Sequence, residues 1–194
     1  MMRTPQNPKV DERFLSRWSP RAMQPHAPLS YDDLEPLFEA ARWALSSYNA
    51  QPWRFLYATA DEPMFETYLD LLAAPNRRWA EHAGALVLVI SRSQFEHNDK
   101  ESITHSFDAG AAWMSFALQA SSMGLVTHGM QGFDYDAART VLEIPSEFQV
   151  QAMIAVGRPG DPDQLTGEFR EREMPSDRKA LEDIVMHGRY QRNT

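Results

Sequence analysis

The sequence predicts a single domain of 194 residues in which helices alternate with short strands. Hydrophobic residues make up 43% of the chain and charged residues 24%, which is the balance of a folded globular protein. Apolar residues recur at helical spacing in some segments and form short continuous runs in others. These patterns lie between about residues 30 and 157, where we expect the core. Polar arms over residues 1–29 and 158–194 flank it.

The first predicted element is an amphipathic helix that leads into a polar junction. Its apolar residues at helical spacing are Leu34, Leu37, Phe38, Ala41 and Leu45. Pro36 is disfavoured deep in a helix, so we expect the start near Asp32 or Asp33, with Pro36 in the first turn. Residues 46–55 then read SSYNAQPWRF. Hydrogen-bonding side chains gathered here suit a polar, planar ligand, although many ordinary loops are also polar.

Two strands and a second helix follow the junction. Trp53 to Thr59 reads as a strand, and a helix opened by Pro63 is expected to run to about Ala74. Residues 75–78, Pro-Asn-Arg-Arg, break that helix. Residues 83–91 form a continuous apolar run, which predicts a strand buried on both faces.

A helix over residues 107–123 dominates the second half of the core. It is rich in Ala, Gly and Ser, so other helices can approach it closely. We therefore expect it to lie centrally or against a partner subunit, and Gly124 is placed to end it. The remaining predicted elements are a helix over 135–142 capped by Asp134, a strand over 150–156, and a short helix around Leu181, Ile184 and Val185.

The two arms are too polar to bury much surface by themselves. Residues 1–28 hold five prolines, and residues 157–175 hold three prolines and many charges. Ordering such long segments is costly unless they pack on something. The arms therefore suggest an intertwined homodimer, and the alternative is that both ends are frayed.

Composition excludes several classes of function. The 27 acidic and 19 basic residues leave a net charge of −8, which argues against a nucleic-acid binder. The chain has no cysteine, so disulfides, thiolate metal sites and cysteine nucleophiles are excluded. Residues 1–10 lack the apolar core of a signal peptide, and the longest apolar run, residues 85–90, is too short to span a bilayer. A cytoplasmic protein without a membrane partner is the simplest interpretation.

Two basic groups are candidates for binding an anion. Arg17, Ser19 and Arg21 alternate, so in an extended chain their side chains converge on one side, and such a trio suits phosphate. Taken alone, the segment is more often a solvated basic turn. Arg178 and Lys179 form the second group, in the other arm. If the arms wrap a dimer, both groups could meet at one phosphate.

A third candidate is the segment from Thr127 to Phe133, which carries Gly129 and Gly132. Two glycines three residues apart allow backbone amides to approach a ligand closely, and a plain loop is the alternative. The six histidines show no metal-ligand spacing, and no nucleophile elbow, P-loop or dinucleotide-binding glycine motif is present. The tryptophans Trp43, Trp53 and Trp113 are expected in the core.

In this order, the segments resemble the nitroreductase family of FMN-dependent oxidoreductases. The resemblance covers the chain from Phe14 to Tyr190. It consists of the early R-x-S-x-R segment, the S-S-x-N-x-Q-P-W junction, an asparagine before the central strand, the Ala-rich helix, a G-x-x-G-F-D loop and a late Arg-Lys-x-Leu segment. Each motif alone is weak, and their order and spacing carry the resemblance.

The resemblance implies an α+β, three-layer fold whose central, mostly antiparallel sheet is flanked by helices. It further implies a homodimer with two FMN sites at the interface. Arg17, Trp18, Ser19 and Arg21 would hold the FMN phosphate and ribityl end, and Arg178 with Lys179 would close on the phosphate. Ser46, Ser47 and Asn49 would reach the flavin of the other subunit. Asn76 would hydrogen-bond the ring, and Met130, Gln131 and Gly132 would lie along it.

The resemblance also implies a ping-pong reaction in which NADH or NADPH reduces FMN, and a nitroaromatic, quinone or similar small acceptor then takes the electrons. FMN performs this chemistry, so no catalytic side chain is named. Two departures from the family pattern stand at Leu45, where a proline is usual, and at Gln131, which often is an acid. The neutral amide of Gln131 should slightly favour the anionic reduced flavin.

Two alternatives to this function remain open. A protein of the same fold could run a different reaction, such as a dehydrogenation or flavin breakdown. It could also bind flavin or a partner without being an enzyme.

Overall fold

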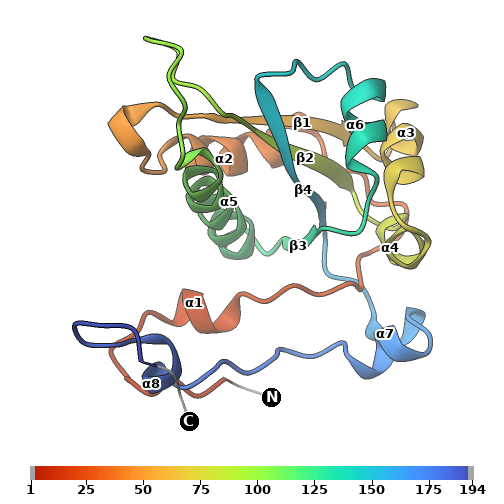
Figure 1. The fold of residues 1–194 in the computed structure, drawn as a ribbon. Helices are drawn as coiled ribbons and strands as arrows, with labels where there is room; N and C mark the ends of the chain where they lie inside the picture. Colours follow the sequence, from red (N-terminus) through yellow and green to blue (C-terminus); the bar gives the residue numbers. More distant parts are fainter. Residues whose placement is uncertain (1–2, 192–194) are drawn as a thin grey trace.

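The computed structural model describes residues 3–191 and shows a four-stranded sheet between two layers of helices (Figure 1). Its strands are β1 (Trp53–Thr59), β2 (Ala85–Arg92), β3 (Val126–Met130) and β4 (Phe148–Gly157), in the order β1-β2-β4-β3. All three neighbouring pairs are antiparallel. The fold is therefore α+β with an antiparallel sheet, as expected.

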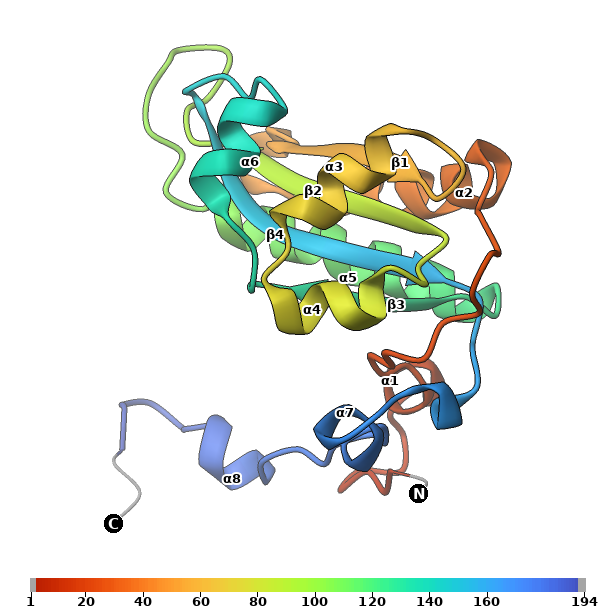
Figure 2. The same ribbon diagram turned by 90° about the vertical axis from the view of Figure 1, so that its right-hand side faces the viewer.

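Helices cover both faces of the sheet (Figure 2). On one face, α2 (Tyr31–Arg42) and α5 (His105–Ser122) enclose a core that contains Val87 and Val89 of β2. On the other, α3 (Met64–Leu71), α4 (Ala74–Ala80) and α6 (Tyr135–Val141) pack around Leu86 and Leu88. Because successive strand residues point to opposite faces and both faces are covered, the buried part of β2 needs apolar residues on both sides, which explains the unbroken apolar run over residues 85–90.

Local capping sets the start of α2. Ser30 and Asp33 form a capping box at the start of α2, so the helix begins at Tyr31. Pro36 lies in the second turn rather than the first, which corrects the prediction. Its missing hydrogen bond affects only the carbonyl of Asp32, which belongs to an exposed residue and has access to water.

Three expectations from the sequence are wrong. The helix after Pro63 ends at Leu71, and Pro75 occupies the first turn of a separate helix, α4, where a missing N–H is tolerated. Residues Val126–Met130 form the edge strand β3 rather than a loop. Trp43 is 75% exposed, whereas Trp53 lies in the core as expected and Trp113 is half-buried against it.

The two arms run side by side beneath the domain and contain only short helical turns (Figure 1). These turns are α1 (Glu12–Ser16), η2 (Pro162–Gln164), α7 (Glu168–Glu171) and α8 (Leu181–Ile184). The guanidinium group of Arg3 donates to the carbonyls of Leu15 and Arg17 in its own arm and to that of Ser176 in the other. The arms are therefore joined to each other rather than frayed. Between residues 3 and 191, no helix is both long and apolar enough to cross a membrane.

Candidate functional site

A basic pocket of about 240 Å³ lies where the two arms meet β3. The residues that line it are Arg3, Arg17, Trp18, Ser19, Arg21, His128, Arg172, Met174, Ser176 and Arg178. None of these described lining residues is acidic. The alternation predicted for the first arm is present, since Arg17 Nη1 lies 3.5 Å from Ser19 Oγ. The structure thus brings Arg17 and Arg178, from opposite ends of the chain, to one cavity.

Among residues 3–191, no acid lines this pocket, and the carboxylates that interact with its arginines, among them Glu173, Glu168 and Asp177, lie outside the lining. Burial, followed by the neighbouring cations Arg3 and Arg178, lowers the pKa of Arg17 below the usual range of arginine. Burial and the Arg178 cation likewise lower the pKa of Arg3. Arginine stays protonated at neutral pH, so these groups repel one another when no anion is bound. A phosphate dianion would relieve this repulsion and accept their hydrogen bonds.

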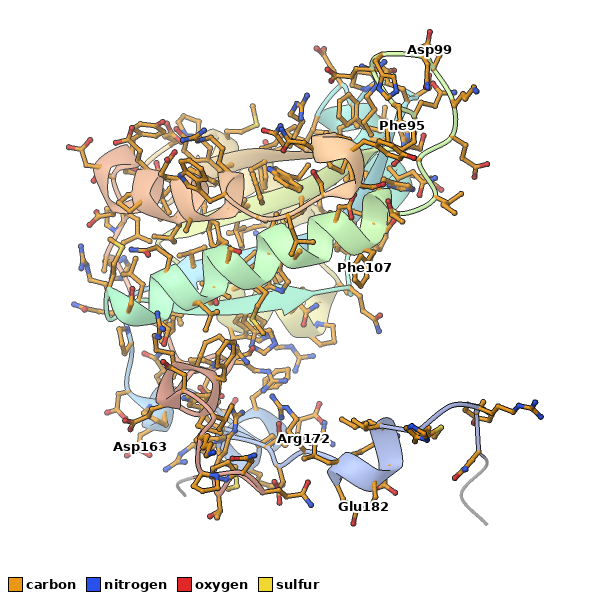
Figure 3. All side chains as sticks on the ribbon, turned by 90° about the vertical axis from the view of Figure 1, so that its left-hand side faces the viewer. Phe95, Asp99, Phe107, Asp163, Arg172 and Glu182 are labelled. Atoms are coloured by element: carbon orange, nitrogen blue, oxygen red, sulfur yellow. The ribbon has the colours of Figure 1, made fainter. Side chains whose placement is uncertain are left out.

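Glu173 fixes the wall of the pocket rather than filling it. Its Oε1 accepts the backbone N–H groups of Arg21 and Ala22 at 2.7 and 2.8 Å, and its other oxygen lies 4.0 Å from Arg21 Nη1. The side chain of Glu173 is only 1% exposed. This buried carboxylate therefore ties the second arm to the R-x-S-x-R segment. Arg172, labelled in Figure 3, lies in the same arm. It pairs with Glu168 at 3.3 Å.

A second pocket, of about 390 Å³, lies next to the first. It is lined by Ala73, Pro75, Asn76, His128, Gly129, Met130, Gln131 and Gly132. The start of α4 and the end of β3 are held together here, because Asn76 Nδ2 donates to the carbonyl of Gly132 at 3.0 Å. A Cβ atom on Gly132 would lie 2.6 Å from Asn76 Nδ2, so only glycine leaves room for this contact.

His128 lines both pockets and joins them. Its Nδ1 lies 3.2 Å from the carbonyl oxygen of Pro20, which has no donor, so Nδ1 carries the proton and Nε2 is left as an acceptor. Burial, followed by the Arg21 cation, lowers the pKa of His128 to about 4. The imidazole is therefore neutral at physiological pH. The residue lies between the basic pocket and the amide-lined pocket.

Two predicted residues are placed differently from the expectation. The side chain of Met130 is only 4% exposed and belongs to the core cluster, so only the backbone of Met130 is available at the pocket. Lys179 does not line the basic pocket, whereas Arg178 does. Gln131 is exposed and lines the second pocket.

The junction residues Ser46, Ser47 and Asn49 line neither pocket. They lie in and beside the turn η1 (Ser47–Asn49). Ser46 Oγ already accepts the backbone N–H of Gln51 at 3.0 Å, whereas the exposed side-chain amide of Asn49 has no hydrogen-bond partner within the described chain. In one protomer, the predicted site therefore falls into two connected pockets and a separate junction.

Five residues at the basic pocket were missed by the motif analysis: Arg3, His128, Arg172, Met174 and Ser176. Arg3 and Arg172 stand in charged, proline-broken arms where single arginines carry no pattern. His128 lies in the glycine-containing segment over residues 127–133, but the sequence does not indicate that its ring is buried. Their roles depend on how the arms pack, which no local spacing reveals.

The donor set fits a ligand with a phosphate at one end and a polar, planar group at the other. Guanidinium and hydroxyl groups surround the first pocket, and amide and backbone groups surround the second.

Comparisons with known proteins identify the family and the fold. The Nitroreductase family model matches residues 15–75 and 60–158. A crystal structure described as an oxidoreductase containing FMN is 42% identical, with a TM-score of 0.93 over 97% of this chain and 96% of that one. An uncharacterized 15.4 kDa protein from the ask 5′ region of Mycolicibacterium smegmatis is 33% identical over 69% of this chain and 88% of its own length. A Desulfovibrio desulfuricans protein crystallised with FMN shares the fold, with a TM-score of 0.72 and 22% identity over 96% of this chain and 100% of that one. The chain therefore belongs to the nitroreductase family.

Proposed function

We propose that this protein is an FMN-dependent oxidoreductase that uses NADH or NADPH to reduce small acceptors, such as nitroaromatics or quinones, in a ping-pong reaction. The observation that carries the proposal is the meeting of arginines from both arms in one pocket without an acid, next to an amide-lined pocket. The 42% identical structure contains FMN, which supports this choice of cofactor. Bound FMN would supply the hydride chemistry, and the protein would bind and orient it.

The residues of this chain divide the binding work between the two pockets. Arg17, Arg21 and Arg178 would hold the phosphate by charge-assisted hydrogen bonds, with Ser19 beside them. His128 would offer Nε2 as an acceptor to a hydroxyl between the pockets. Asn76 donates one Nδ2 hydrogen to Gly132, so its Oδ1 and its second Nδ2 hydrogen remain available to the ring.

The same proposal includes a homodimer, because the junction lies apart from both pockets in one protomer. Large apolar side chains are exposed near the junction and at the start of α5, including Trp43, Tyr48, Ile103 and Phe107 at 75, 86, 83 and 75% exposure. Figure 3 shows Phe107 projecting from α5. Such a concentration is typical of a surface that a partner covers. The partner would bring its Ser46, Ser47 and Asn49 to the flavin.

The first test is the visible spectrum of the purified protein, before and after anaerobic addition of NADH or NADPH. A flavin spectrum that bleaches supports the proposal. A flavin that stays oxidised argues for another reaction or a binding role. Absence of flavin after incubation with FMN contradicts the proposed cofactor.

The binding residues are tested by Arg17→Ala and Arg178→Ala. Each should weaken FMN binding by about 1.5–3 kcal/mol, the usual range for hydrogen bonds to charged groups. Arg13→Ala is the matched control, because Arg13 lies in the same arm, has a side chain that is 71% exposed and forms its ion pair with Asp11. Calorimetric titration of the flavin-free protein measures all three. Equal FMN affinity in the wild type and both pocket variants would refute the assignment.

A further inference from the structure

We propose that Asp108 is a positioning residue that holds the junction in the conformation needed for cofactor contact. This inference rests on the proposed function, because it gives Ser46, Ser47 and Asn49 their task. Asp108 is in the first turn of α5 and touches neither pocket. Its role depends on its contact with the backbone of the junction.

The junction has an unusual backbone. Tyr48, Asn49 and Gln51 all have left-handed φ angles, of 52°, 53° and 47°. Side chains other than glycine are disfavoured there, and only asparagine adopts this region at low cost. The segment would therefore relax to other conformations unless its surroundings hold it. Tyr48 is 86% exposed, and its ring meets the ring of Phe95 edge-on with the centroids 5.7 Å apart, so its side chain provides little of that restraint.

Asp108 provides a restraint at the start of this segment. Its Oδ2 accepts the backbone N–H of Ser47 at 3.1 Å and the hydroxyl of Thr104 at 3.3 Å. The residue is only 2% exposed, and within residues 3–191 its carboxylate forms no ion pair. A buried carboxylate without a cation is costly unless hydrogen bonds compensate it. One of the hydrogen bonds that compensate the Asp108 carboxylate comes from the backbone of the junction. Releasing the junction would therefore leave this carboxylate with fewer hydrogen bonds.

The turn that carries Asp108 is itself fixed to the sheet. Gln151 Nε2 donates to Ser91 Oγ at 2.9 Å, and Ser91 Oγ lies 2.7 Å from Nδ1 of His105, the first residue of α5. Ser91 is fully buried and His105 is 8% exposed. Supporting hydrogen bonds of this kind hold a positioning group in one place. The strained junction is thus connected to the centre of the sheet through α5.

The test compares Asp108→Ala, Asp108→Asn and Ser30→Ala. Alanine removes the acceptor, whereas asparagine keeps an oxygen that can accept the Ser47 N–H. Ser30→Ala is the control, because it removes the helix cap of α2, a loss of comparable size, without touching Asp108. If Asp108→Ala does not fold, Asp108→Ser is used in its place, because the serine side chain is too short to reach the N–H of Ser47. Two readouts are measured: amide hydrogen exchange of residues 46–51 in the flavin-free protein, and FMN affinity.

We expect exchange of the Ser47 amide to rise roughly tenfold or more in Asp108→Ala, and FMN affinity to fall by roughly tenfold, as loss of a charge-assisted hydrogen bond predicts. Asp108→Asn should stay close to the wild type in both readouts, and Ser30→Ala should leave both unchanged. Unchanged Ser47 exchange in Asp108→Ala would overturn the proposal, as would faster exchange with unchanged FMN affinity. If the wild type bound no FMN, the proposed function would fail, while the exchange data would still decide whether Asp108 holds the junction.

Discussion

Single arginines at opposite ends of the chain define the basic pocket. The Arg17-x-Ser19-x-Arg21 alternation could be predicted from the sequence, because side chains in an extended segment alternate between two sides. Arg3 could not, since its guanidinium group reaches the pocket wall by bonding carbonyls of both arms. Every residue has a backbone carbonyl, so residue types do not predict a contact with one.

His128 should make the stability of the fold depend on pH. Its pKa is lowered to about 4 in the folded state, whereas the ordinary value of histidine is about 6.5. Between these values the unfolded chain binds a proton that the folded chain does not. Stability is therefore greatest above about pH 6.5 and falls as the pH falls towards 4, by roughly 2–3 kcal/mol.

This dependence is measured by urea unfolding of the wild type and His128→Asn between pH 7 and pH 4.5. Asparagine can still donate to the Pro20 carbonyl but does not titrate, so its stability should decline less. His187→Asn, at an exposed position, should decline as the wild type does. The same decline in His128→Asn and the wild type would show that His128 titrates normally in the folded protein.

At the scale of elements, the end of α5 shows a local motif that sets up the site. Gly124 has a left-handed φ of 74°, and its N–H donates to the carbonyl of Ser121. The N–H of Leu125 donates to the carbonyl of Ala120, which completes a Schellman motif. This turn sends the chain back along the helix into β3, which carries His128 to the two pockets.

Gly124→Ala should therefore destabilise the fold by about 1–2 kcal/mol, because a Cβ is disfavoured in the left-handed conformation. A Cβ at this position would meet no atom within 4 Å, so the cost is conformational rather than steric. Ser122→Ala, at an exposed position in the same last turn, should change stability by less than about 0.5 kcal/mol. Thermal and urea unfolding measure both. Equal stability of the two variants would exclude a conformational role of Gly124.

The element that sequence patterns missed, β3, is short and lies at the edge of the sheet. Only one of its sides pairs with another strand, β4, and its residues include Gly129, which weakens strand propensity. Its pairing is decided by the turn after α5 and by the neighbouring strand, so local propensity did not reveal it.

For the whole molecule, the proposed homodimer predicts that the face around α5 is covered in solution. Phe107→Glu should dissociate the dimer while leaving the protomer folded, because a negative charge is favourable near the start of a helix. Val141→Lys is the matched control: Val141 is exposed as well, at 51% against 75% for Phe107, but it ends α6 on the opposite face, where a positive charge suits the helix end.

Light scattering of both variants measures the assembly, and FMN titration measures its consequence. We expect Phe107→Glu to be monomeric with weakened FMN binding, and Val141→Lys to remain dimeric with wild-type affinity. A wild type that is monomeric with tightly bound FMN would refute the idea that the partner completes the site.

The sequence by itself determined the elements that depend on local physics. The unbroken apolar run of β2, the spacing of apolar residues in α2 and Gly124 at the end of α5 all specify their structures through contacts between near neighbours. Tertiary structure alone decided which arginines share a pocket, that the ring of His128 turns inward, and that Asp108 contacts Ser47 across 61 positions of the chain. These features depend on how distant segments pack, and the patterns of residues within each segment are compatible with more than one such packing.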